Sequence, residues 1–350
     1  MNKELKFRLL FLISLLFLFI SIIYFSISYS SIFLLIGLAV ILSFVLFIIL
    51  ELYFRVQHNI DKLNSKIDHS SELITIKTLC SGKKLIDKVE SNNSVEDITV
   101  IIPIKDRSDS RLRNLLMSIN NQSYKNNLIH TIIVDYGGKE SSIPIIKGLA
   151  RKYHAKYLRV DTKAAWNKCH ALNIAIKNTT SKYILVADAD LIFENNYIKE
   201  CIHELKNDPF QFVLCRPLDC SNGDITNHTI KDYGELKKRC RYRSNVKDYT
   251  QGRGIISTLR CYFETIHGYD EFYTLWGRED DDLVKRFELL GLKMRYITDK
   301  TSYIHQWHKR FMGLGRSKKH IKKQIKKNDS YFNRNNSIIR NPDSWGELDS

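Results

Sequence analysis

The most apolar part of the chain is its first fifty residues. Residues 9–29 are almost wholly apolar, and after a short serine-containing break residues 32–50 are apolar again. Each run has about the 20 residues that a helix needs to cross a bilayer, so the pattern predicts a transmembrane hairpin at residues 1–55. A secretory signal is one alternative, but its apolar core spans only about 7–15 residues. A single anchor with a longer loop is the other.

Basic residues flank this hairpin on both sides, at Lys3, Lys6, Arg8, Arg55, Lys62 and Lys66. Because cytoplasmic flanks of membrane helices are enriched in Lys and Arg, both ends of the hairpin are expected in the cytoplasm. A juxtamembrane helix and linker are expected at residues 56–94. The rest of the chain is then expected to be cytosolic.

From about residue 95 onward, short apolar runs rich in β-branched residues alternate with stretches of helical periodicity. Strands are predicted at residues 98–102, 129–134, 157–160 and 183–187, and helices at residues 112–119, 145–153, 166–177 and 283–290. Strands separated by helices of this length indicate βαβ units, so the predicted class is α/β with a mainly parallel sheet. In such sheets ligands bind at the carboxyl ends of the strands, where this chain has its polar clusters.

Charge adds a constraint on the partner. The chain has 54 Lys and Arg against 38 Asp and Glu, a formal net charge of +16. This surplus favours an anionic partner: nucleic acid, a phospholipid surface or a nucleoside diphosphate. Neither a Gly-x-Gly-x-x-Gly nor a Walker motif is present, so a standard dinucleotide site and a P-loop are not supported. The seven cysteines include no Cys-x-x-Cys pair, which excludes a conventional zinc ribbon.

The first candidate motif is Asp188 and Asp190, which follow a predicted buried strand. Two carboxylates at positions i and i+2 can face one divalent cation, and oxygen ligands suit Mg²⁺ or Mn²⁺. A solvated turn is the alternative interpretation, because Asp-x-Asp is common by chance.

The second motif is the acidic run 279–282, directly after Trp276 and Gly277. An acidic helix N-terminus is one explanation, because carboxylates favour the positive end of the helix dipole. The preceding tryptophan favours sugar stacking, with one carboxylate as a general base. Asp282, just before the predicted helix, is expected to cap or orient that helix, so Asp282→Asn should cost little.

The third motif is His305 and His308, which flank a tryptophan at 307. Both histidines could ligate a metal, but an isolated pair at this spacing is also typical of ordinary surface or core positions.

Together, these motifs resemble the GT-A-fold glycosyltransferases from about residue 98 to 308. The likeness is greatest to the β-1,4-galactosyltransferase type and to bacterial capsule and chondroitin-type transferases within family 2. Four segments carry the resemblance: Ile-Pro-Ile-Lys-Asp-Arg at 102–107, Trp-Asn-Lys-Cys-His-Ala-Leu-Asn at 166–173, Asp-Ala-Asp at 188–190, and Trp-Gly-Arg-Glu-Asp-Asp-Asp at 276–282.

The resemblance implies a GT-A domain, with a Rossmann-like mixed sheet, at residues 95–308. It implies that the donor is a UDP-sugar, contacted by Pro103, Arg107, Asp135, Trp166, Lys168 and Asp188. It also implies an Mn²⁺ or Mg²⁺ ion held by Asp190, His305 and Asp188, with Asp188 also near the ribose. A methionine ligand of the family is replaced by Ser302.

On the acceptor side, the resemblance implies that Asp280 is the catalytic base. Trp276, Glu279 and Asp281 fall where the family contacts the acceptor sugar. Arg278 stands in place of a family glycine, so the acceptor is expected to differ or to carry negative charge. The segment 251–254 lies where the family has its substrate-gating loop, although a simple turn fits its glycines equally well.

These features predict a membrane-anchored inverting glycosyltransferase of surface polysaccharide synthesis. It would transfer a sugar of the Gal, GalNAc, GlcNAc or Glc type to a hydroxyl of a glycan or glycolipid acceptor. The predicted location is the bacterial inner membrane, multi-pass, with the catalytic domain in the cytoplasm. The alternative is a degenerate membrane-anchored protein that binds sugar or nucleotide without catalysis.

Residues 309–350 are predicted to form a basic C-terminal tail. Residues 309–327 carry nine Lys or Arg and no acidic residue. A nucleic-acid partner is not expected, because this segment has only Phe311 as a base-stacking aromatic. Membrane lipids fit the charge better, a solvated basic helix is the plainer alternative, and an anionic glycolipid acceptor would satisfy the same charge.

Overall fold

The computed structural model describes residues 96–221, 225, 232–242, 251–308 and 318–348. The chain divides into two units, residues 1–70 and 71–350. The first unit lies outside the described residues, as do the predicted hairpin and juxtamembrane segment. All that follows concerns the second unit.

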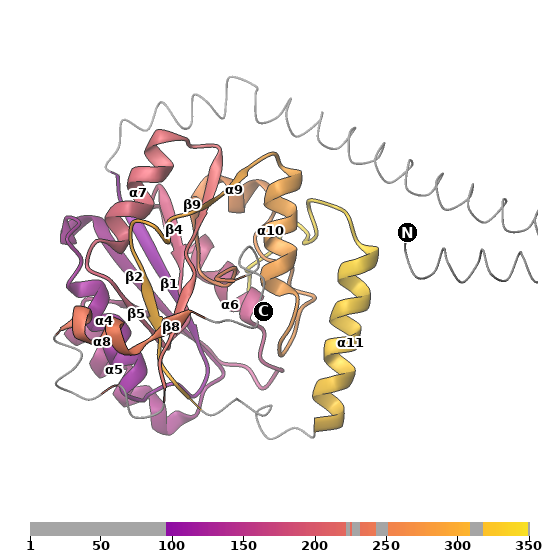
Figure 1. Ribbon diagram of the computed structural model, residues 1–350. Coiled ribbons are helices and arrows are strands. Elements are labelled where there is room, and N and C mark those ends of the chain that lie inside the picture. The colour runs from indigo at the N-terminus through magenta and orange to yellow at the C-terminus, as the bar shows by residue number, and fades with distance from the viewer. Residues whose placement is uncertain (1–95, 222–224, 226–231, 243–250, 309–317, 349–350) are drawn as a thin grey trace, which may run out of the picture. The chain divides into compact units, whose positions relative to one another are not determined.

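The main sheet has seven strands in the order β10-β6-β9-β4-β1-β2-β3 (Figure 1). Their bounds are β1 (Ile98–Ile104), β2 (Ile129–Tyr136), β3 (Lys156–Val160), β4 (Tyr183–Val186), β6 (Gln211–Leu214), β9 (Ile256–Leu259) and β10 (Lys293–Tyr296). All neighbours are parallel except β9, which runs antiparallel to both β4 and β6. The predicted α/β class with a mixed sheet is therefore confirmed.

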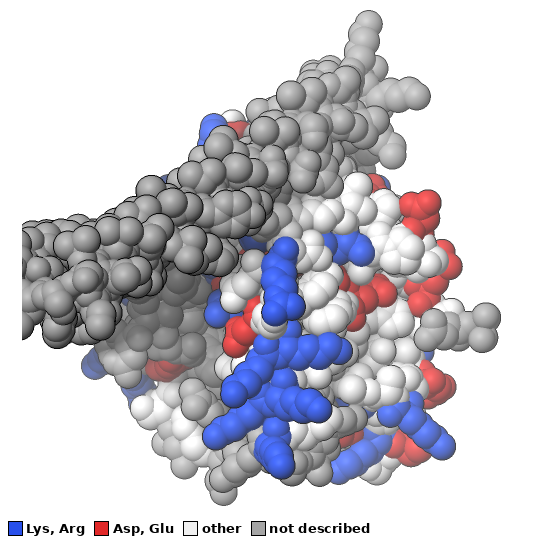
Figure 2. All heavy atoms as spheres, turned by 90° about the vertical axis from the view of Figure 1, so that its right-hand side faces the viewer, with Lys and Arg blue, Asp and Glu red and all other residues white. Residues whose placement is uncertain are grey.

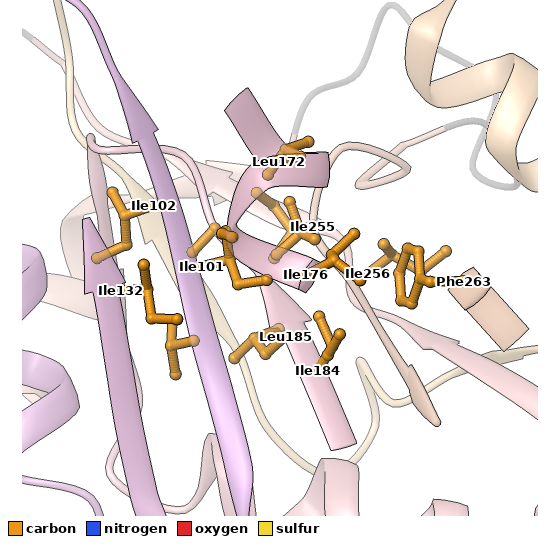
Figure 3. Close-up of a cluster of buried hydrophobic side chains, with 14 of the residues drawn as sticks. Ile101, Ile102, Ile132, Leu172, Ile176, Ile184, Leu185, Ile255, Ile256 and Phe263 are labelled. Atoms are coloured by element: carbon orange, nitrogen blue, oxygen red, sulfur yellow. The ribbon is translucent and has the colours of Figure 1, made fainter. Parts of the chain in front are cut away.

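Helices cover this sheet, which explains why its central strands are continuously apolar. Every residue of β1 is buried, as expected for a strand with both faces covered. The helices are α4 (Ser110–Asn120), α5 (Ile143–Lys152), α6 (Lys168–Lys177), α7 (Tyr197–Asn207), α8 (Tyr233–Arg239), α9 (Arg260–Thr265), α10 (Glu279–Leu289) and α11 (Lys318–Arg334), with 3₁₀ turns η1 (Asn126–Leu128) and η2 (Glu140–Ser142). Figure 3 shows Leu172 and Ile176 of α6 against the apolar side chains of the sheet.

A second, four-stranded sheet brings together two parts of the sequence-predicted site, the Asp-Ala-Asp motif and His305. Its order is β5 (Leu191–Phe193), β11 (Tyr303–His305), β7 (Pro217–Asp219) and β8 (Arg241–Tyr242). In the register of β11, His305 pairs with Leu191 on one side and with Asp219 on the other. Because Leu191 directly follows Asp190, this pairing sets His305 beside the Asp-Ala-Asp motif.

The structure differs from the sequence prediction at α10. The helix begins at Glu279, four residues earlier than predicted, so the whole acidic run lies in its first turn. The helix dipole is positive at this end, and carboxylates are stabilised there. The helix dipole therefore stabilises the acidic run in the first turn of α10, which explains why the helix begins earlier than predicted.

The prediction of a multi-pass inner-membrane protein needs correction. Within the described residues, no helix combines the length and the apolar composition that crossing a bilayer requires. That location is therefore not supported.

The residues predicted as a basic tail contribute to the second unit. Helix α11 runs beside α10 (Figure 1), and the Lys285 ammonium donates to the backbone oxygen of Asn335 at 3.0 Å. Beyond α11, Ile338 and Trp345 are buried in the main core. Residues 318–348 are thus part of the packed structure.

Candidate active site

A group of possible metal ligands forms where the two sheets meet. Asp190 is buried, and its Oδ2 lies 3.2 Å from Nε2 of His308, while its Oδ1 lies 3.8 Å from Nε2 of His305. One ligand atom from each of the three residues falls within 4.8 Å of the others. Burial alone would raise the pKa of Asp190, but the hydrogen bond with His308 and the charge of His305 lower it below its usual value.

The donor chemistry of this group fits a divalent metal ion. One carboxylate and two imidazoles are ligands that first-row transition metals accept. The other ring nitrogen of His305, Nδ1, lies 3.2 Å from Oδ1 of Asp219. A carboxylate behind a metal-binding histidine fixes the orientation of the ring, and Asp219 is placed to do this.

Asp188 lies outside this ligand group, contrary to the sequence interpretation that made it a metal ligand. Its Oδ1 pairs with the Lys168 ammonium at 3.2 Å. The same ammonium lies 3.3 Å from Oδ1 of Asp280. Lys168 therefore joins the Asp-Ala-Asp loop to the first turn of α10, two segments that are distant in the sequence.

The local sequence explains why Lys168 stands at this point. Asn167 is the N-cap of α6, and its Oδ1 accepts a hydrogen bond from the backbone N–H of His170 at 2.9 Å. This cap makes Lys168 the first residue of the helix. Burial would lower the pKa of Lys168, but the neighbouring Asp188 and Asp280 carboxylates raise it well above its usual value. Lys168 is therefore a cation at neutral pH.

The other residues of the acidic run face different partners. Glu279 is buried, and its Oε2 accepts from the backbone N–H of Gly277 at 2.7 Å. Burial, followed by repulsion from Asp280, raises the pKa of Glu279 to about 7. Asp281 accepts from Arg253 at 2.7 Å and from Arg278 at 3.1 Å. In the described structure, neither the Glu279 carboxylate nor the Asp281 carboxylate forms an ion pair with Lys168, as the Asp280 carboxylate does.

Asp282 does not cap α10, which corrects the sequence interpretation. The N-cap is Arg278, in left-handed conformation with φ 75°. Asp282 is instead completely buried, with Oδ2 2.7 Å from Nε of Arg286 and Oδ1 3.1 Å from Nη2 of Arg340. Tyr273 donates to it at 3.2 Å. The physical reason is that the first turn of α10 turns this position toward the core.

Trp276 is the most exposed large apolar residue in the described part of the chain, with 67% of its surface accessible. It stands just before α10, in the loop whose Leu275 N–H donates to the carbonyl of Trp166 at 2.8 Å. An exposed indole on a loop fixed by hydrogen bonds is a platform on which a sugar ring can stack.

The predicted donor-side residues lie at the carboxyl edge of the main sheet. Pro103 is near the end of β1, and Arg107 follows in the next loop, where its positive charge contributes to lowering the pKa of Asp190. Trp166 is half-buried and packs edge to face on Tyr136, with ring centroids 6.0 Å apart. Asp188 follows β4 at the same edge.

Asp135 holds the sheet edge together. It is completely buried, and Oδ2 accepts from the Tyr157 hydroxyl at 2.8 Å and from Arg159 at 2.7 Å. Its Oδ1 accepts from the backbone N–H of Gly138 at 3.1 Å. Both oxygens are thus engaged within the protein, so Asp135 shapes the donor side through these partners.

Two family models match the segments that carry this geometry. The model described as glycosyl transferase family 2 matches residues 99–268. The model described as N-terminal domain of galactosyltransferase matches residues 236–309. Residues 99–268 therefore carry a glycosyl transferase family 2 domain. The resemblance to GT-A glycosyltransferases of this family is therefore confirmed.

Solved structures similar to this chain include TarS of S. aureus. The TarS 1-349 complex with UDP has 14% identity and a TM-score of 0.48, over 60% of this chain and 60% of that chain. The complex with UDP-GlcNAc has 14% identity and a TM-score of 0.48, over 63% of this chain and 61% of that chain. The match thus spans about three-fifths of the length of the TarS chains. No curated protein gives a significant sequence match.

The family resemblance placed only His305 at the metal, although the sequence had offered His308 as a possible ligand too. The signal was present, because His308 follows His305 by three residues. A histidine pair at that spacing has no preferred meaning by itself, and only the pairing of β11 with β5 shows that both rings face Asp190.

Proposed function

We propose that this glycosyltransferase moves a hexose or N-acetylhexosamine from a UDP-sugar to a hydroxyl of a glycan acceptor, with inversion at the sugar carbon. The observation that carries the proposal is the shared contact of Lys168 with Asp188 and Asp280. It sets the donor-side carboxylate and the candidate base within reach of one side chain. A donor sugar bound beside these carboxylates would present its reacting carbon to an acceptor hydroxyl that contacts Asp280.

Asp280 acts as the general base in this proposal. It takes the proton of the acceptor hydroxyl while that oxygen bonds to the sugar carbon and the bond from this carbon to UDP breaks. Lys168 orients the Asp280 carboxylate through their ion pair. Trp276 stacks on a sugar ring and excludes water from one side of the reacting groups.

Asp190, His305 and His308 would hold the divalent ion. Two imidazole donors favour Mn²⁺ over Mg²⁺, which prefers oxygen ligands. When bound, such an ion supplies positive charge that offsets the charge developing on the leaving diphosphate. Arg107 adds a fixed positive charge on the same side.

The proposal is tested by supplying the purified full chain with UDP-Gal, UDP-GalNAc, UDP-GlcNAc and UDP-Glc, and measuring UDP release with and without Mn²⁺. We expect release from one of these donors that depends on the ion. The matched control is Asp280→Asn, which should bind UDP as the wild type does. If no donor is hydrolysed although UDP binds, the chain is a sugar- or nucleotide-binding protein without catalysis.

A further inference from the structure

Helix α11 carries a stripe of lysines on its surface. Lys319, Lys322, Lys323 and Lys326 follow the i, i+3, i+4, i+7 spacing that defines one helix face, and all four are exposed. Figure 2 shows this face of the molecule, with Lys and Arg side chains gathered along it. Among the residues that the structure describes, none of these four ammonium groups pairs with a carboxylate.

Such a stripe disfavours the isolated helix, because like charges three and four residues apart repel each other. Packing at the other end holds α11 in place. Tyr331 stacks on Phe272 with ring centroids 3.7 Å apart, and Asn328 is completely buried. The lysine stripe is therefore maintained by contacts that do not involve the lysines.

The same packing joins α11 to the loop that presents Trp276. The Asn328 amide donates to the carbonyls of Trp276 and Gly277, each at 3.2 Å. Asp329 accepts from Nε of Arg278 at 2.6 Å. Helix α11 thus directly supports the loop that carries Trp276, the candidate acceptor platform. The lysine stripe continues along the helix away from this platform.

Two guanidinium groups stand at that site. Arg253, from the loop before β9, and Arg278, from the loop before α10, share the single carboxylate of Asp281. Arg278 also contacts Asp329, so these two guanidinium groups meet two carboxylates and are balanced in charge. The surplus positive charge beside the candidate acceptor site is therefore that of the lysine stripe.

We infer that the acceptor is an anionic glycan polymer, with phosphate or carboxylate groups, which the lysine stripe holds beyond the reacting hydroxyl. This inference rests on the proposed function. Lys319 and Lys326 are seven residues apart, about 10 Å along the helix, so the stripe spans more than one sugar ring. A neutral or single-sugar acceptor would leave it unused.

Nucleic acid satisfies the charge but not the rest of this surface. Base recognition on single strands needs aromatic rings that are available for stacking. On α11 the Tyr331 ring is stacked on Phe272, and Phe332 faces the cations of Arg278 and Lys285. Neither ring is therefore available for base stacking beside the stripe, which favours a sugar polymer.

The experiment measures binding of the full chain to four fluorescently labelled probes by anisotropy: polyphosphate, polygalacturonate, dextran and an oligothymidylate. The test variant carries Lys→Gln at 319, 322, 323 and 326. The matched control carries Lys→Gln at 125, 147, 152 and 199, four lysines that are exposed elsewhere. Glutamine keeps helix propensity, so both variants should retain the melting temperature of the wild type.

We expect the wild type to bind polyphosphate or polygalacturonate, with the tighter of the two identifying the anionic group, and to ignore dextran. The test variant should bind about tenfold more weakly or worse, and the control as tightly as the wild type. Equal loss in both variants, no binding of either polyanion, or tighter binding of the oligothymidylate would overturn the inference. UDP release without acceptor, measured on the same preparations, separates these results from a failure of the proposed function.

Discussion

Lys168 and Asp280 form an ion pair, with Nζ 3.3 Å from Oδ1, although 112 positions separate them in the sequence. Asp188 contacts the same ammonium, so removing the cation leaves two carboxylates facing each other. Lys168→Met should lower kcat/KM by about 10²-fold, a typical loss for one electrostatic group of an active site. The kcat/KM of Lys168→Arg should lie between those of the wild type and Lys168→Met, because arginine keeps the charge of lysine but not its shape. UDP release at several donor concentrations measures this. Lys163→Met, on an exposed loop, is the control, and an unchanged Lys168→Met enzyme would contradict the assignment.

Asp280→Asn should slow the chemical step by about 10²-fold or more, because the amide keeps the shape but cannot accept the proton. UDP affinity should stay nearly constant, since Asp190, His305 and His308 lie on other segments. Single-turnover kinetics and UDP titration separate the two effects. Near-normal transfer by Asp280→Asn together with an inactive Asp281→Asn would move the base to Asp281.

The ligand group predicts that three single variants share one phenotype. Asp190→Ala, His305→Ala and His308→Ala should each weaken Mn²⁺ binding by at least about tenfold, and reduce activity in step. Calorimetric titration with MnCl₂ measures the affinity directly. His203→Ala, an exposed histidine on α7, serves as the control. Full activity in the presence of a strong chelator would rule out a metal role for the group.

Asp282→Asn should destabilise the protein by about 3–5 kcal/mol, because it leaves buried Arg286 without its counter-charge and Arg340 with Asp270 alone. Chemical denaturation gives the free energy of unfolding. Asp343→Asn, whose side chain is fully exposed, should change it little. A stability loss no larger than that of the control would restore the capping interpretation.

Glu279 makes stability depend on pH. Its pKa rises from the usual 4.5 to about 7 on folding, so the folded state binds more protons than the unfolded state between these values. This contribution to stability is therefore complete below about pH 4.5 and is lost as the pH rises through about 7. Glu279→Gln keeps the acceptor for the Gly277 N–H but has no charge. Its melting temperature should fall less between pH 5 and 8 than that of the wild type, and equal slopes would show that Glu279 does not titrate there.

Local patterns predicted the first half of the fold well. The apolar runs that became β1 to β4 are continuous and β-branched, and α4, α5 and α6 follow their helical periodicity. The second sheet escaped prediction because strands of two or three residues, such as β8 and β11, are too short to show alternation. Strand β9 reads as Ile-Ser-Thr-Leu, with polar residues that are buried only because β4 and β6 flank it.

The candidate site, like the fold, could be predicted from the sequence only in part. Asp190, Asp280 and Trp276 were identified from motifs whose residue types carry the chemistry. The environments of Glu279 and Asp282 were not, because they depend on distant partners. Asp282 can be buried because it pairs with Arg340, a residue that lies far from it in the sequence. The residues next to the acidic run in the sequence therefore give no sign of this pairing.

The position of Arg340 also bears on how the chain is made. Arg340 lies 3.1 Å from Asp282 and 3.6 Å from Asp270, and both carboxylates are buried. A nascent chain that has not yet reached this residue must leave these two acids with Arg286 as their only buried cation in the described cluster, or keep the segment open to water. Folding of this unit during translation is therefore expected to be completed only after Arg340 has emerged from the ribosome.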